Sequence, residues 1–282
     1  MADSHDLHRT AVAPGRRIAL TPGQRIAMRA ATALFGAIGL AGATAADLSV
    51  EQVGAMLKSA SAAAPADFSA KDLSDLDLSG LDFRHANLRG ASLFASKLVQ
   101  ADFRGANLEG ANLNGAWLMG TNFSGANLRR ASLLSVVILG GTVKAMPVFK
   151  GADLSGVKMI ADLPGADLSG ADFSHAMLGV NIKNQGMGQM RTDLSNANLA
   201  GATLAGADLN RALMRFSNLR GSDLRGANFF RVKLGGADLS GADIAGADFT
   251  EADLDATIFR DAKGFAQARG LEQAENADKI VR

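Results

Sequence analysis

The stretch that decides the fold is ADFRGANLEG, residues 101–110, in which two five-residue modules follow each other without a gap. Each module reads A-(D/N)-(L/F)-x-G: a small residue, a short polar residue, a large apolar residue, a variable residue and a glycine. The large apolar residue therefore recurs at every fifth position, as Phe103 and Leu108 do here. A period of five matches neither the period of about 3.6 of an amphipathic helix nor the period of about 2 of a half-buried strand. It indicates an internal repeat.

The same pattern covers most of the chain. The large apolar residues form four runs, which span 68–143, 149–159, 163–178 and 194–259. The second run is shifted by one residue relative to the first, and the third run shifts back. Residues 179–192 interrupt the pattern. We therefore place a repeat domain at 67–262.

The composition of the module predicts how it packs. A single module cannot bury its Leu or Phe, whereas stacked coils can, and each coil can hydrogen-bond to its neighbours. The Leu or Phe fills a narrow interior, and a side chain larger than Ala beside it would overfill that space. Glycine at the end of the module suits a turn with positive φ. The Asp or Asn suits a hydrogen bond within that turn. The sequence thus predicts an all-β solenoid.

At these residues the chain resembles the pentapeptide-repeat family. The resemblance extends from Phe68 to Phe259. It implies a right-handed quadrilateral β-helix with four modules in each coil, and hence about nine coils. With about 4.8 Å between stacked strands, such a rod is on the order of 45 Å long.

Short helices are expected at both ends, because an open coil exposes unpaired edges and an apolar interior. Ser49 to Gln52 has the pattern of a capping box, which predicts a helix to about Ser61 within a capping and linker segment at 46–66. Residues 263–282 have apolar residues on one side of a helical projection and predict a C-terminal helix. That helix serves as a cap or as a dimer contact.

The composition excludes several classes of function. The 282 residues include no Cys, which excludes a disulfide framework, a thiol nucleophile and a Cys-ligated metal. Only four His are present, and two of them lie in the first ten residues. The sequence therefore predicts that the protein is not an enzyme: it assigns no catalytic, cofactor-binding or metal-ligating residue and implies no cofactor.

Residues 1–45 have the layout of an export signal. Five Arg precede the apolar run 30–45, which ends in Ala43-Thr44-Ala45. The prediction is an exported, periplasmic protein that begins near Ala46 and carries a net charge of about −2. A true start at Met28, an uncleaved membrane anchor formed by 30–45, a mitochondrial-type leader and a cytosolic helix are the alternatives.

Residues 20 apart share a face of the solenoid if each coil holds four modules. One pair of neighbouring faces then carries an apolar strip around the only Trp. The strip comprises Phe94, Val99, Trp117, Met119, Leu134 and Leu139. Apolar strips of this kind mark contacts with a partner or a second copy. The alternatives are cover by a terminal segment and simple tolerance of apolar side chains.

The next face along the chain carries basic residues at the same position of successive coils. They are Arg84, Arg104 and Lys144. One interpretation is a site for an anionic partner, such as a phospholipid headgroup, a cell-wall polymer or nucleic acid. We favour the other interpretation, an ordinary solvated face that Asp82 and Asp102 neutralise.

These observations predict an exported, non-enzymatic solenoid that acts as a rigid structural or interaction module. Its partner is an unknown protein or envelope component, or a second copy bound through the C-terminal helix or the Trp117 strip; nucleic acid is not expected. Some pentapeptide-repeat proteins resemble a DNA duplex and bind DNA gyrase, which is the alternative function. A near-neutral charge and an export signal disfavour that alternative, because DNA mimicry needs a continuous negative surface.

Overall fold

The computed structural model describes residues 46–138, 145–180 and 191–282. All of them belong to one compact unit, Thr44–Arg282. The predicted export signal, 1–45, lies outside the described residues.

The unit begins with a helix, α2, which spans Val50–Ser59. Ser49 caps it: the backbone N–H of Gln52 donates to the Ser49 hydroxyl at 3.3 Å, and the Ser49 N–H donates to Gln52 Oε1 at 2.7 Å. This is the capping box that the sequence pattern predicts. Val53 is fully buried, and Leu57 packs against the core. Helix α2 therefore contributes apolar surface to the core of the unit.

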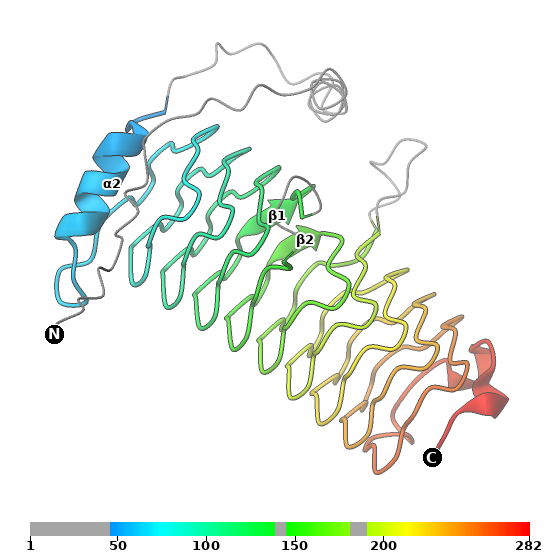
Figure 1. Cartoon of the computed structure of the whole chain (residues 1–282). Helices are drawn as coiled ribbons and strands as arrows, with labels where there is room; N and C mark the ends of the chain where they lie inside the picture. Colours follow the sequence, from blue (N-terminus) through cyan, green and yellow to red (C-terminus); the bar gives the residue numbers. More distant parts are fainter. Residues whose placement is uncertain (1–45, 139–144, 181–190) are drawn as a thin grey trace, which may run out of the picture. The chain divides into compact units, whose positions relative to one another are not determined.

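The repeats form a stack of coils joined by parallel β-bridges (Figure 1). The second position of each module is the bridged one, as in Asn107↔Asn127, and regular partners are 20 residues apart. One coil thus contains four modules. Two strands of three residues form within the described part of the chain, β1 (Ser132–Leu134) and β2 (Lys158–Ile160), and they pair in parallel. Elsewhere each bridge is isolated because a turn follows within three residues.

The core consists of the first and third positions of the modules. Leu108 is fully buried and Ala106 is 1% exposed. Phenylalanines at the third position stack along the interior: the Phe83 and Phe103 ring centroids are 4.6 Å apart. The inward assignment predicted from the period of five is therefore confirmed.

The second and fifth positions shape the turns as the sequence predicts. The side chain of Asp193 accepts a hydrogen bond from the Ser195 N–H at 2.8 Å, and this two-residue pattern recurs along the stack. Gly105, at the fifth position, has φ +67, in the left-handed region that glycine adopts without strain.

Three irregularities interrupt the 20-residue spacing, and the first differs from the prediction. Asn122 bridges Val148, and Gly120 N–H donates to the Ala145 carbonyl at 2.7 Å. Ala145 therefore holds the fourth position that the periodicity assigned to Leu139, and Phe149 holds the third position assigned to Val143. The apparent one-residue shift is thus an insertion, 139–144, which lies outside the described residues.

The other two irregularities lie close together. In the coil that contains β2, one module has no fifth position. Ile160 holds its fourth position and Ala161 already holds the first position of the next module, because Asp162 is the next bridged residue. The predicted interruption at 179–192 follows: Asp162 bridges Asp193 across it. Residues 181–190 lie outside the described part of the chain.

The predicted C-terminal helix is wrong. Residues 263–282 continue the coil, with two short 3-10 turns, η1 (Leu271–Gln273) and η2 (Ala277–Lys279). Arg269, for example, bridges Asp248, and its N–H donates to the Ala247 carbonyl at 2.8 Å. Gly264 and Gly270 have φ of +85 and +71, which ends any helix at these positions. The apolar residues that suggested a helix instead pack onto the end of the core.

Candidate interaction surfaces

The Trp117 strip is only partly available for contact. Trp117 bridges Lys97 on one side and Val137 on the other, and all three share a face as predicted. Trp117, Val137 and Val99 are half-buried, which leaves part of each side chain open to a partner.

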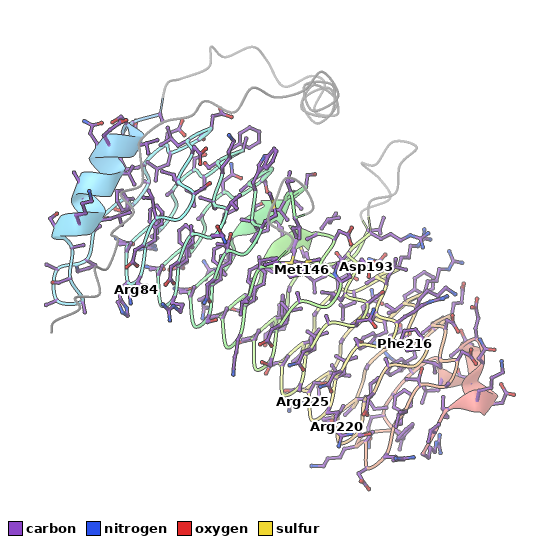
Figure 2. All side chains as sticks on the ribbon, viewed as in Figure 1. Arg84, Met146, Asp193, Phe216, Arg220 and Arg225 are labelled. Carbon is purple, nitrogen blue, oxygen red and sulfur yellow. The ribbon has the colours of Figure 1, made fainter. Side chains whose placement is uncertain are left out.

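Met119 does not belong to the exposed strip, because it is only 2% exposed. The chain that follows the insertion lies next to Met119, since the Ala145 carbonyl accepts from the adjacent Gly120 N–H. The following residues, Met146 and Pro147, are half-buried and buried, respectively (Met146 is labelled in Figure 2). Leu139 lies outside the described residues.

Phe94 and Leu134 lie on the neighbouring face but do not form a continuous patch. Phe94 is 42% exposed and Leu134, in β1, is half-buried. Asn114 occupies the same position in the coil between them, and its Oδ1 accepts hydrogen bonds from the Leu134 N–H and the Ser132 hydroxyl. The six residues of the predicted strip therefore reduce to a smaller surface around Trp117.

The predicted basic face is a row of ion pairs. The Arg84 guanidinium donates to both carboxylate oxygens of Asp82, with its shortest contact at 2.6 Å, and Arg104 does the same to Asp102. These hydrogen bonds lower the pKa of both carboxyl groups. The pairing supports a solvated, neutralised face over a site for an anionic partner. Lys144 lies outside the described residues, and Lys150 holds the place predicted for it.

Arginines further along the stack follow the same rule. Arg225 pairs with Asp223 at 2.6 Å and Arg220 pairs with Asp238 at 2.9 Å. Figure 2 shows these two arginines many coils away from Arg84. Ion pairs with a carboxylate thus recur along the described coils.

Sequence reasoning missed the large apolar residue that is most exposed among the described residues. Phe216 is 67% exposed and has φ +57 (Figure 2). It occupies a fifth position, where the corresponding residues of neighbouring coils are Asn196 and Gly236. A large side chain at a glycine position was the sequence signal that could have identified it.

Two carboxylates lie side by side at the bridge that spans the interruption at 179–192. Asp162 and Asp193 are bridge partners, and burial together with the charge of Asp193 raises the pKa of Asp162. Among the described residues no group of three or more His, Cys, Asp or Glu side chains could hold a metal ion.

A cavity of about 260 Å³ lies between the end of α2 and the first coil. Its lining includes Leu57 and Ala66 on the apolar side and Asp82, Arg84 and His85 on the polar side. Arg84 is already paired with Asp82, so the polar side of the cavity has little unpaired charge for a ligand. Over 46–138, 145–180 and 191–282, no helix is long and apolar enough to cross a bilayer.

The stacked coils, the buried Ala and Leu columns and the glycine turns define a repeat protein of the β-solenoid class. The family model for pentapeptide repeats matches eight copies along the chain. The matched residues are 66–93, 86–125, 96–134, 161–179, 192–231 and 222–261. The chain belongs to the pentapeptide-repeat family, whose members form right-handed β-helix solenoids.

Several solved structures are similar to this chain. HetL, a pentapeptide repeat protein involved in heterocyst differentiation regulation from the cyanobacterium Nostoc sp. strain PCC 7120, is 28% identical over 81% of this chain and 94% of its own, with a TM-score of 0.36. QnrB1, a plasmid-mediated fluoroquinolone resistance protein, is 21% identical over 70% and 90%, with a TM-score of 0.33. A pentapeptide repeat protein from the Arabidopsis thaliana thylakoid lumen is 25% identical over 64% and 70%, with a TM-score of 0.13.

No curated protein matches the chain. The similarity to the solved structures carries no argument about function, because each TM-score is below 0.5. Function has to be argued from the surface of this chain.

Proposed function

We propose that the protein is an exported, non-enzymatic solenoid, a quadrilateral β-helix of about nine coils, that presents a rigid surface to a protein or envelope partner. The observation that carries this proposal is the half-buried Trp117 on an outer face, with Val137 as its bridge partner in the next coil and Val99 two residues after its other bridge partner, Lys97. Trp is enriched among the residues that dominate binding at protein interfaces. A solenoid holds such residues in fixed register, so that little conformational entropy is lost on binding.

The export part of the proposal rests on the sequence of residues 1–45. An apolar run at 30–45 that follows Arg25 and Arg29 and ends in Ala43-Thr44-Ala45 is typical of a cleavable signal. The run is shorter than the roughly 20 residues that a spanning helix needs. A periplasmic location follows from cleavage in a cell with two membranes.

Cell fractionation with intact-mass measurement tests the export step. We expect a periplasmic species whose first residue is close to Ala46. A membrane-bound species that retains 30–45 would support the anchored alternative, and a cytoplasmic species would contradict export.

A separate experiment tests the Trp117 surface. Trp117→Asp combined with Val99→Asp places two charges on the proposed contact and none in the core. We expect the wild-type protein to elute from a periplasmic extract in a complex larger than the free chain, and the variant to elute as the free chain. Arg225→Asp, on another face, is the matched control and should leave the complex intact. A variant that still elutes in the complex would rule out this surface.

The surface gives no support to a role as a DNA mimic that targets gyrase. Such a role requires a continuous negative face, and Arg84, Arg104 and Arg220 interrupt the carboxylates along one face. A dimer through a C-terminal helix is no longer proposed, because that helix does not form.

A further inference from the structure

Phe216 is a residue that the fold does not need. Its fifth-position φ of +57 lies in the left-handed region, where a bulky side chain is an outlier. Gly165 and Gly236 hold the same place in other coils of this corner, with φ of +72 and +70. Phe216 also leaves 67% of its surface in solvent. Sixteen non-glycine residues of the described chain have positive φ, Asn196 and Ala256 of this corner among them, so this conformation belongs to the turn. The exposed apolar ring is what distinguishes Phe216, and it indicates a contact surface.

The residues around Phe216 form two columns with a fixed register. Leu213 bridges Lys233, and Lys233 bridges Asp253, so the three modules that contain them lie directly above one another. The fourth positions of these modules are Arg215, Gly235 and Asp255, and the fifth positions are Phe216, Gly236 and Ala256. Arg215 and Asp255 thus lie two coils apart in the same column, and Gly235 lies between them.

The glycines between them leave room for the larger side chains. The Phe216 ring lies over Gly236, where a Cβ would come within 2.5 Å of ring atoms Cδ1 and Cε1. Arg215 reaches in the same direction, and its guanidinium lies 3.7 Å from Asp253. That contact is long for an ion pair, and Arg215 remains exposed, so its guanidinium can donate to a second carboxylate.

We propose that this corner, formed by Arg215, Phe216, Gly235, Asp255 and Ala256, is the interface of an antiparallel homodimer. A two-fold axis through Gly235 reverses the column in the other copy. The coil before Gly235 in one copy therefore lies opposite the coil after Gly235 in the other copy. Arg215 then faces Asp255 of the partner subunit, and the symmetry repeats the pair. The backbone of Phe216 lies opposite Ala256 of the partner subunit, and its ring leans over Gly236 toward the axis, where it meets the partner's Phe216.

The distribution of charge favours a second copy over a membrane or an acidic protein. Arg215, Arg231 and Lys233 are offset by carboxylates in the same region, as the Arg231–Glu251 and Lys233–Asp253 pairs show. A membrane or acidic partner would require an excess of positive charge. A patch with both signs at equal numbers is self-complementary under two-fold symmetry.

The register of the dimer follows from the same columns. An axis at the level of Arg215 would oppose the two copies of Arg215, which repel each other. An axis at the level of Ser195 would place Arg215 opposite Pro164 of the partner subunit, which carries no carboxylate. Only the crossing at Gly235 pairs opposite charges in both halves.

Sedimentation equilibrium of the protein, purified as the cell processes it, tests the proposal. The wild-type protein should be a dimer at micromolar concentration. Phe216→Gly should raise the dissociation constant at least about tenfold, because it removes the apolar anchor. Glycine suits the left-handed backbone at this position, so the variant should melt at or above the wild-type temperature.

Charge reversal tests the register. Arg215→Asp and Asp255→Arg should each weaken the dimer by about tenfold, and the double variant should restore it. Asp255 also has an exposed pair with Lys279 at 3.3 Å, whose loss has little effect on the fold. Arg225→Asp is the matched control and should not change the dimer. A monomeric wild type, a dimer insensitive to Phe216→Gly, or a double variant without recovery would each overturn the proposal. Trp117→Asp should leave this dimer unchanged, which separates it from the proposed partner site.

Discussion

The rings of Phe123 and Phe149 stack with centroids 5.1 Å apart and planes 7° from parallel, although residues 139–144 are inserted in the coil between them. They extend the column of Phe83 and Phe103, whose rings are stacked in the same way. Whether a side chain enters the core is therefore set by its position in the module, and not by the number of residues that separate it from the preceding coil. An insertion between the third and fourth positions leaves the interior unchanged.

Deletion of 139–144 should give a folded protein in the same register. The deletion joins Ile138 to Ala145, which already holds the next module position and accepts a hydrogen bond from the Gly120 N–H. Loop length has a small effect on stability, so we expect a melting temperature within about 4 °C of wild type by circular dichroism. Deleting 123–128 removes the same number of residues together with Phe123 and Leu128, and should abolish cooperative unfolding. A similar loss in the first variant would contradict the assigned register.

Two substitutions in one module test the inward columns. Leu108→Ala should lower the free energy of unfolding by about 2–5 kcal/mol, because it leaves a cavity in a packed interior. Ala106→Leu should cost about 1–3 kcal/mol through overpacking beside it. Glu109→Ala, at the outward fourth position of the same module, should stay within about 0.5 kcal/mol of wild type. Urea titration measures all three, and equal tolerance of the two core variants would argue against the assignment.

The regular modules could be predicted from the sequence because every position has one physical role. Leu108 fills the interior, Ala106 packs beside it, and Gly105 forms the turn before it. The insertion was harder to detect. A six-residue insertion in a period of five looks like a shift of one, so Val143 and Phe149 both appeared to continue the core.

The ends and the surface were less predictable, for different reasons. Residues 263–282 have apolar residues at helical spacing, but Gly264 and Gly270 and the pairing with the preceding coil favour a further turn of the solenoid. Pairing between coils joins residues that are far apart in the sequence, so a local pattern of apolar residues does not reveal it. On the surface, Met119 is buried where the chain that follows the insertion pairs with the adjacent Gly120. Phe216 could have been noticed from its place at a fifth position, but its exposure is known only from the structure.

Helix α2 should depend on its capping box. Ser49→Ala removes the hydroxyl that accepts from the Gln52 N–H and should destabilise the helix by about 1 kcal/mol. We expect faster hydrogen exchange at the Val53 amide, with unchanged exchange at Leu108 in the central coils. Ser61→Ala, just beyond the helix, is the control and should leave exchange at Val53 unchanged. Unchanged exchange at Val53 in Ser49→Ala would show that packing on the first coil alone holds the helix.

Removing the charge of Asp162, the bridge partner of Asp193, should stabilise the folded protein. Burial and the neighbouring charge raise the pKa of Asp162 in the folded state, so its ionisation opposes folding at any pH above the unfolded value of about 3.9. Asp162→Asn should therefore raise the free energy of unfolding at pH 7. The gain should be less than about 1 kcal/mol, because the carboxylate is only partly shielded from water and most of its surface is exposed. The gain should disappear as the pH falls below about 3.9, where the wild-type carboxyl is neutral in both states.

Asp102→Asn provides the opposite case on the same scaffold. The hydrogen bond from Arg104 lowers the pKa of Asp102, so its contribution is favourable above the unfolded pKa of about 3.9 and is lost as the pH falls through the lower folded value. This substitution should destabilise the protein at pH 7 and become neutral in strong acid. Urea titrations from pH 7 to pH 2 should thus show the two variants approaching wild type from opposite sides. If both variants destabilised equally at pH 7, the two carboxylates at 162 and 193 would not repel each other across the bridge.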